Sequence, residues 1–155
     1  MKTKLLHCYL VWTIILLQAC SETTKSPEDE IRDFIQSSVE AAENRDLDSL
    51  NDLVHHNYLD KNGYNRQRLG GLLRVYIFRH KEIYLFTKID EIDLLTDSEA
   101  VVRLYVAMAG SVISDIDALA TLRAQVYEFE LQLIKEDDWL LHHASWRPAS
   151  STDFE

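Results

Sequence analysis

The segment 121–148 places the tightest limits on how this chain folds. It contains two runs of alternating apolar and polar residues around a short acidic turn, which is the pattern of a β-hairpin. With Glu136 and Asp137 as a two-residue loop, the predicted pairs on one face are Leu133 with Leu140, Leu131 with His142, Phe129 with Ala144 and Tyr127 with Trp146. This face is apolar and the other is mixed, which predicts a sheet covered on one side. We therefore expect Phe129 and Trp146 in the core.

The residues before this hairpin predict helices that cover the apolar face of the sheet. Ser26 is the predicted N-cap of a helix over Pro27–Glu43, in which apolar residues recur at helical spacing. Asp46 and Asn65 are the predicted N-caps of two further helices. Two more strand-like runs follow at 82–95 and 100–109, and residues 110–120 form a connector. The chain therefore predicts helices first and an antiparallel sheet afterwards.

Length and charge narrow the class of protein. A chain of 155 residues is long enough for one core and too short for two ordinary domains. Its 26 acidic and 16 basic residues give a net charge of −10, which becomes −12 if Lys2 and Lys4 leave with a leader peptide. This excess of acid argues against a nucleic-acid partner.

Six basic residues nevertheless gather in one loop and helix. They are Lys61, Arg66, Arg68, Arg74, Arg79 and Lys81. Within an acidic chain this is a local positive patch. It suits anionic lipid headgroups or an acidic partner, and a solvated surface is the alternative.

The N-terminus has the layout of an export signal. Two lysines precede an apolar run that is too short for a comfortable membrane span. The run ends in Leu17, Gln18, Ala19 and Cys20, which resemble the lipobox of bacterial lipoproteins. The resemblance implies that residues 1–19 are a signal peptide and that Cys20 is acylated as the mature N-terminus. An ordinary secreted protein or a short anchor is the alternative.

Further expectations follow from this processing. Ser21 after the cysteine favours the periplasmic face of the outer membrane, by similarity to enterobacterial sorting. Cys8 lies in the leader, so no free thiol remains for catalysis or metal binding. Residues 20–26 are then the lipidated cysteine and a tether, 27–148 the folded domain and 149–155 a C-terminal tail.

The order of elements resembles the nuclear transport factor 2-like superfamily. Its most specific feature here is the last strand, where Trp139 follows an acidic turn and Trp146 closes the strand. The resemblance covers about residues 27–148. It implies an α+β fold in which a curved, cone-shaped antiparallel sheet of four or more strands wraps three N-terminal helices and leaves a pocket at its wide end. Such domains serve as isomerases, dehydratases, polyketide cyclases, ligand binders and interaction modules, so the fold does not decide the function.

Alternation places several polar side chains on the predicted concave face. Arg123 and Gln125 share one side of their strand with Tyr127, and residues 103 and 105 alternate likewise on the neighbouring strand. In the register above, His142 lies on the same face, where a general base would also lie. The predicted ligand contacts are Arg103, Tyr105, Arg123, Gln125, Tyr127 and His142. They suit a mostly apolar ligand with one anionic or carbonyl group, and a water-exposed rim is the alternative.

The histidine pairs fit a metal site poorly. Adjacent residues on a strand point to opposite faces, so His142 and His143 are not expected to share an ion. His55 and His56, at a helix end, suit the helix dipole and solvent. We therefore predict no metal and no cofactor.

Catalysis is the second hypothesis. Ketosteroid isomerase has the fold that this chain resembles, and it uses an aspartate base with a tyrosine and a protonated aspartate. In this sequence, Asp90 or Asp93 reaches the concave face only in some registers. We therefore expect a cell-envelope lipoprotein, held by acylated Cys20, whose domain binds a small apolar ligand or a protein partner, with homodimer formation through the sheet as a further alternative. An isomerase, dehydratase or cyclase-like enzyme that uses the cone pocket is the alternative function.

Overall fold

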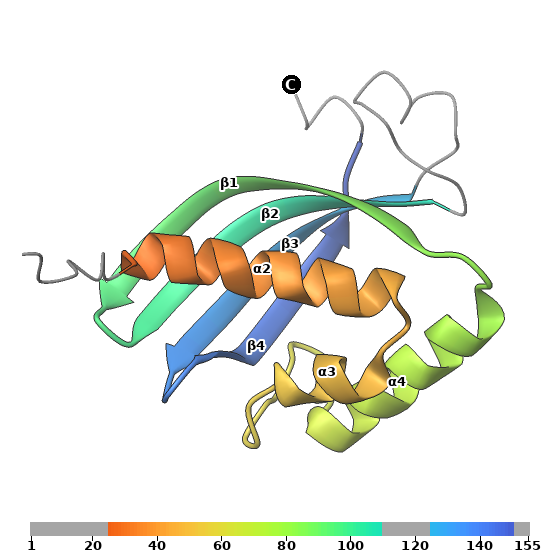
Figure 1. The fold of residues 1–155 in the computed structure, drawn as a ribbon, viewed down its shortest axis with the longest axis horizontal. Coiled ribbons are helices and arrows are strands. Elements are labelled where there is room, and N and C mark those ends of the chain that lie inside the picture. Colours follow the sequence, from red (N-terminus) through yellow and green to blue (C-terminus); the bar gives the residue numbers. More distant parts are fainter. Residues whose placement is uncertain (1–24, 110–124, 151–155) are drawn as a thin grey trace, which may run out of the picture.

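The computed structural model describes residues 25–109 and 125–150. Within these ranges three helices precede four strands, as the sequence predicts (Figure 1). The helices are α2 (Pro27–Glu43), α3 (Leu47–Asp52) and α4 (Arg66–Arg79), and the strands are β1 (Tyr84–Thr96), β2 (Glu99–Ala109), β3 (Gln125–Lys135) and β4 (Trp139–Pro148). None of the helices in these ranges has the length and apolar character that a membrane span requires. The predicted connector 110–120 lies outside the described residues.

Polar caps determine where each helix begins. The Ser26 hydroxyl accepts a hydrogen bond from the Asp29 N–H at 3.2 Å, and a proline takes the first helical position. Asp46 caps α3 and Asn65 caps α4 in the same manner. Each cap satisfies a backbone donor that the helix leaves without an internal partner. All three predicted N-caps are therefore confirmed.

The strands form one antiparallel sheet in the order β1-β2-β3-β4, and the sheet curves around α2 (Figure 1). The concave side of the sheet and one face of α2 share the main core. Its buried members are Ile31, Phe34 and Ile35 of α2 with Ala100, Val102, Leu104, Leu133 and Trp139 of the sheet. The predicted α+β class, with a curved four-stranded antiparallel sheet over N-terminal helices, is confirmed.

The register between β3 and β4 differs from the predicted one. The observed pairs are Lys135 with Trp139, Leu133 with Leu141, Leu131 with Ala144 and Phe129 with Trp146. The loop has three residues, 136–138, which shifts the pairing by one. A bulge at His142, which has no partner across the ladder, shifts it by one more. Because the two shifts sum to two residues, Trp146 stays on the concave side of the sheet. However, Trp146 is 36% exposed, so it is not the core residue that we predicted.

The chain between α3 and α4 covers the free edge of β4. The His55 N–H donates to the Leu141 carbonyl at 3.0 Å, and the Leu59 N–H donates to the His142 carbonyl at 3.2 Å. These bonds satisfy edge groups that would otherwise be open to pairing with another chain. The bulge at His142 thus lies where a distant segment pairs with the strand.

Helix α4 packs loosely against the rest of the domain and lies to one side of the sheet (Figure 1). Only Ile77 among its 14 residues is buried. Leu72, Val75 and Phe78 are 45%, 50% and 86% exposed. Arg45 holds the C-terminal end of the helix, since its guanidinium donates to the Ile77 carbonyl at 3.0 Å.

Candidate functional site

Two of the predicted ligand contacts lie together on the concave side of the sheet, at the start of β3. Gln125 and Tyr127 begin β3, and Gln125 pairs with Met108 of β2. The Tyr76 hydroxyl of α4 lies 3.5 Å from the Met108 sulfur. Burial raises the pKa of Tyr76, and the nearby Tyr127 raises it further. Phenol and thioether groups therefore meet here, beside the strand position of Gln125.

Arg103 and Tyr105 lie on the opposite, convex side of the sheet. Their neighbour Leu104 pairs with Phe129 and packs on the concave side with α2. Arg103 instead forms an ion pair with Glu91, and Tyr105 packs on a small convex cluster around the buried Ala107. The expectation that these two residues share a face with Tyr127 is therefore wrong. Alternation within β2 predicts only that they share a face with each other, and the pairing with β3 decides which face.

The two remaining predicted contacts do not join them. Arg123 lies outside the described residues. His142 occupies the bulge of β4, and its ring centroid lies 5.4 Å from that of His55. The bulge thus directs His142 toward the segment that covers the strand edge. The structure brings together only Gln125 and Tyr127 from the predicted set.

A cluster that the sequence did not predict lies at this edge. His55, His56 and Glu136 place one potential metal-ligand atom each within 4.8 Å of one another. The 5% exposed His55 is held at both ring nitrogens, because Nδ1 accepts the Asn57 N–H at 3.1 Å and Nε2 lies 3.2 Å from the Glu136 carboxylate. Since Nδ1 accepts, Nε2 carries the proton and donates to Glu136. His55 therefore has no free lone pair for a metal ion in this arrangement.

The concave side of the described strands carries no carboxylate. Its positions on β2 are occupied by the even-numbered residues 100–108, and on β3 by the odd-numbered residues 125–133. On β1, Asp93 pairs with Val101 on the convex side, and the exposed Asp90 sits at a bulge. The registers that would bring Asp90 or Asp93 to the concave face are not observed.

A buried tyrosine and a buried carboxylate do lie near each other in the segment before α4. Tyr58 is 2% exposed and Asp60 is 4% exposed. Asp60 Oδ1 accepts the N–H groups of Asn62 and Tyr64 at 2.7 and 2.8 Å, so it organises the turn. The Tyr58 hydroxyl and Asp60 Oδ2 have no hydrogen-bond partner among the described residues. Burial raises the pKa of Tyr58, and the Asp60 charge adds to the effect.

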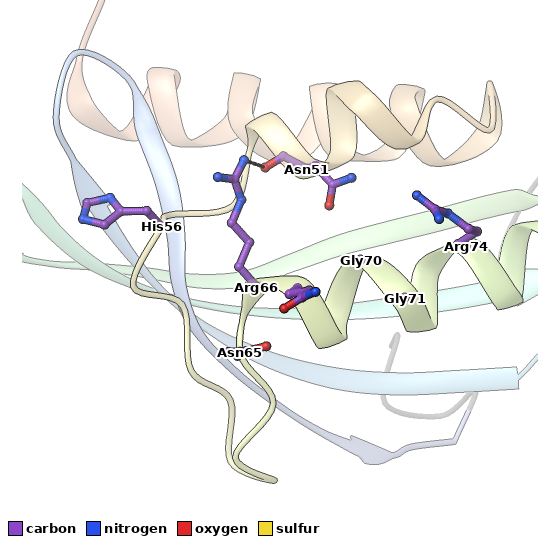
Figure 2. Close-up of a pocket in the computed structure, with 8 residues that line it drawn as sticks. Asn51, His56, Asn65, Arg66, Gly70, Gly71 and Arg74 are labelled. Atoms are coloured by element: carbon purple, nitrogen blue, oxygen red, sulfur yellow. Dashed lines mark hydrogen bonds between the residues drawn. The ribbon is translucent and has the colours of Figure 1, made fainter.

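An open groove of about 750 Å³ lies elsewhere, between α3 and α4. We call it the α3–α4 groove. Its lining residues are Asn51, His56, Asn65, Arg66, Gln67, Gly70, Gly71 and Arg74. Figure 2 shows the guanidinium groups of Arg66 and Arg74 on either side of the Asn51 side chain. The volume falls within the range of about 300–1,000 Å³ that is usual for small-molecule sites.

Two contacts give the α3–α4 groove its shape. Arg66 Nη2 donates to the Asn51 carbonyl oxygen at 2.7 Å, which holds this guanidinium in place. A Cβ atom on Gly70 would lie 2.8 Å from Asn51 Oδ1, so glycine lets the two helices approach closely here. Arg74 has no hydrogen bond or ion pair with any described residue. One arginine is thus fixed, and the other is free to adapt to a ligand.

A second hollow, of about 510 Å³, lies between the first half of α2 and the turn that joins β3 to β4. Its two lysines are paired, since Lys135 and Lys25 form ion pairs with Glu30 and Asp33. The hollow therefore presents fewer unused donors than the α3–α4 groove. Neither hollow is lined by Gln125, Tyr127 or His142.

No protein-family model matches the sequence, and no curated protein does so either. Solved structures match in fold. A candidate scytalone dehydratase from Novosphingobium aromaticivorans aligns with a TM-score of 0.65 at 15% identity, over 79% of this chain and 84% of that chain. An NTF-2 like protein of unknown function from Shewanella oneidensis aligns with a TM-score of 0.56 at 20% identity, over 78% and 98% of the two chains.

A ketosteroid isomerase-like protein from Erwinia carotovora atroseptica gives a TM-score of 0.58 at 12% identity, over 79% of this chain and 95% of that chain. At such identities the similarity concerns the fold. The chain has the nuclear transport factor 2-like fold that its sequence predicts.

Proposed function

We propose that this protein is a lipid-anchored component of a bacterial cell envelope whose domain binds a ligand or a protein partner. The observation that carries the binding role is the α3–α4 groove, which is open, polar and lined by arginine and amide groups. Sites that recognise ligands combine such a concavity with a few orienting polar groups. The concave side of the sheet offers a second, mostly apolar surface around Tyr127.

The proposed anchoring rests on the sequence. The leader ends in the lipobox-like residues 17–20, and acylation of Cys20 would attach the chain to a membrane, with Ser21 favouring the periplasmic face of the outer membrane. The tether of about six residues that follows can span roughly 20 Å, so the domain would stay close to that membrane. Pairing of two copies through the convex sheet face belongs to the same proposal as one form of protein interaction.

Catalysis in the manner of an isomerase or dehydratase is the second candidate. The buried pair of Tyr58 and Asp60, each with an oxygen that lacks a described partner, favours it. The names of two structural neighbours, a scytalone dehydratase and a ketosteroid isomerase-like protein, point in the same direction. However, the two side chains are 2% and 4% exposed, so a substrate has no access to them in this conformation. Binding is therefore the better-supported function.

Replacement of the lipobox cysteine tests the anchoring. The wild-type protein and a Cys20→Ser variant are expressed in a bacterial host with radiolabelled palmitate, and both are followed through membrane fractionation. We expect label and membrane retention only for the wild type, because each buried methylene contributes about 0.8 kcal/mol and several acyl chains hold the protein stably. Equal labelling and equal recovery of the two proteins in the same membrane fraction would rule the anchoring out.

A further inference from the structure

The α3–α4 groove concentrates positive charge in an acidic protein. The whole chain carries a net charge of −10, yet the eight lining residues include two arginines and no carboxylate. Asp52, which pairs with Arg66, is 85% exposed and lies 4.0 Å from it. At this distance and exposure, an ion pair neutralises little of the arginine charge. The groove is therefore a local site of attraction for an anion.

The groove has more hydrogen-bond donors than the two oxygens of a carboxylate can accept. Arg74 offers five N–H groups, and Arg66 offers those that its bond to the Asn51 carbonyl leaves unused. The side-chain amides of Asn51 and Gln67 add further donors. Helix α4 has 14 residues, and its positive N-terminal end contributes Asn65, Arg66 and Gln67 to the same groove. A phosphate group, with more acceptor oxygens than a carboxylate, uses such a donor set most fully.

We infer that the α3–α4 groove binds a phosphate group, with Arg66 as the fixed contact and Arg74 as the adaptable one. The inference names the ligand class for the binding role proposed above and does not depend on acylation of Cys20. Arg66 is held by the Asn51 carbonyl, so it meets the ligand in one orientation. Arg74 has no described partner, so it closes on the phosphate from the other side of Asn51 (Figure 2).

The phosphate can belong to a soluble molecule or to a lipid headgroup. Phe78 follows Arg74 by one helical turn and is 86% exposed, and Val75 is 50% exposed. Residues four apart on a helix are neighbours on its surface, so apolar groups flank the cationic groove. An acyl chain attached to the phosphate would contact Phe78, whereas a small phosphate ester would not. Replacement of Phe78 therefore separates the two sources.

Calorimetric titration of the purified full-length protein in a neutral detergent tests the inference. The probes are inorganic phosphate, glycerol 3-phosphate and dihexanoyl phosphatidylglycerol, with glycerol as an uncharged control. We expect saturable binding of the phosphate compounds with one site per chain and no binding of glycerol. Arg66→Gln and Arg74→Gln are each expected to weaken binding about tenfold or more, since each removes charge-assisted hydrogen bonds. Arg74→Lys keeps the charge but loses the planar fork, so it should restore binding only in part.

The matched control is Arg147→Gln. Arg147 pairs with Glu128 on the convex side of the sheet and has the same charge as the groove arginines, so its loss should leave the affinity unchanged. Arg74 makes no described polar contact, so its variant should melt like the wild type. Similar affinity for all three probes assigns the site to soluble phosphates. Tighter binding of the lipid, reduced to the level of glycerol 3-phosphate by Phe78→Ser, assigns it to a headgroup.

Two results would overturn the inference. One is the absence of saturable binding for all three probes. The other is unchanged binding in a variant that carries both Arg66→Gln and Arg74→Gln. Either result leaves the Cys20 anchoring and a protein-binding role standing, because those are read from membrane fractionation and partner binding and not from these titrations.

Discussion

The Trp139 indole N–H donates a hydrogen bond to the Glu30 carboxylate at 3.1 Å, which joins β4 to α2 across 109 positions of sequence. Lys135 forms an ion pair with the same carboxylate. The Trp139 ring is 4% exposed and belongs to the main core. These contacts thus hold the first turn of α2 against the ends of β3 and β4.

This arrangement predicts a pH dependence of stability. The hydrogen bond from Lys135, followed by that from Trp139, lowers the pKa of Glu30 below its ordinary value of 4.5, although partial burial opposes the shift. A carboxylate with a lowered pKa in the folded state stabilises the protein above its unfolded-state pKa, and that stabilisation is lost as the pH falls through the folded-state pKa. We expect the midpoint of urea unfolding to fall more steeply below pH 4.5 in the wild type than in Glu30→Gln. Parallel profiles for the two proteins would show that the bond contributes nothing.

The two tryptophans of β4 should respond differently to truncation. Trp139 is 4% exposed, so Trp139→Ala should lower the free energy of unfolding by about 3–5 kcal/mol. Trp146 is 36% exposed and stacks on Phe129 with ring centroids 6.2 Å apart, so Trp146→Ala should cost only about 1–2 kcal/mol. Chemical unfolding of both variants measures the difference. Equal losses would contradict the observed burial of the two rings.

The adjacent glycines of α4 provide a second matched pair. A Cβ on Gly71 meets nothing within 4 Å, so Gly71→Ala should stabilise the protein by up to about 1 kcal/mol through helix propensity. A Cβ on Gly70 would lie 2.8 Å from Asn51 Oδ1, so Gly70→Ala should gain less. In an Asn51→Ala background, Gly70→Ala should stabilise the protein as much as Gly71→Ala does. Thermal melting of the four variants measures this, and an equal gain from both alanines in the wild-type background would refute the close approach of α3 and α4.

Removal of the Tyr58 hydroxyl tests whether this buried group lacks a hydrogen-bond partner. The hydroxyl is buried and has no partner among the described residues. Deleting an unpaired buried polar group removes a desolvation cost of about 1 kcal/mol or more. We therefore expect Tyr58→Phe to unfold at the same or a higher urea concentration than the wild type. Destabilisation would mean that the hydroxyl has a hydrogen-bond partner, such as a buried water molecule, and would contradict its unpaired state.

The sequence predicts most of the fold because its strongest signals are local. Ser26, Asp46 and Asn65 each cap the helix that follows, and a cap requires only a few neighbouring residues. The alternation of apolar and polar residues likewise predicts the four strands and their antiparallel pairing. These features need no knowledge of distant parts of the chain.

The register and the site could not be predicted in the same way. The bulge at His142 lies where Leu59 pairs with β4, a contact between segments more than 80 residues apart. The face of Arg103 depends on its pairing with Glu130, which alternation within one strand leaves open. The α3–α4 groove depends on the approach of Asn51 to Gly70. The basic residues 66 and 74 were visible as a patch, but only the structure shows that they flank one hollow.

The binding role is tested most directly by what the protein carries when it is isolated from its native envelope. Native mass spectrometry is applied to the wild type and to the Arg66→Gln, Arg74→Gln double variant, with Arg147→Gln as the charge-matched control. We expect a phosphate-containing small molecule at near one per chain on the wild type and the control, and its loss from the double variant. No bound molecule on the wild type, or the same molecule retained by the double variant, would contradict ligand binding in the α3–α4 groove.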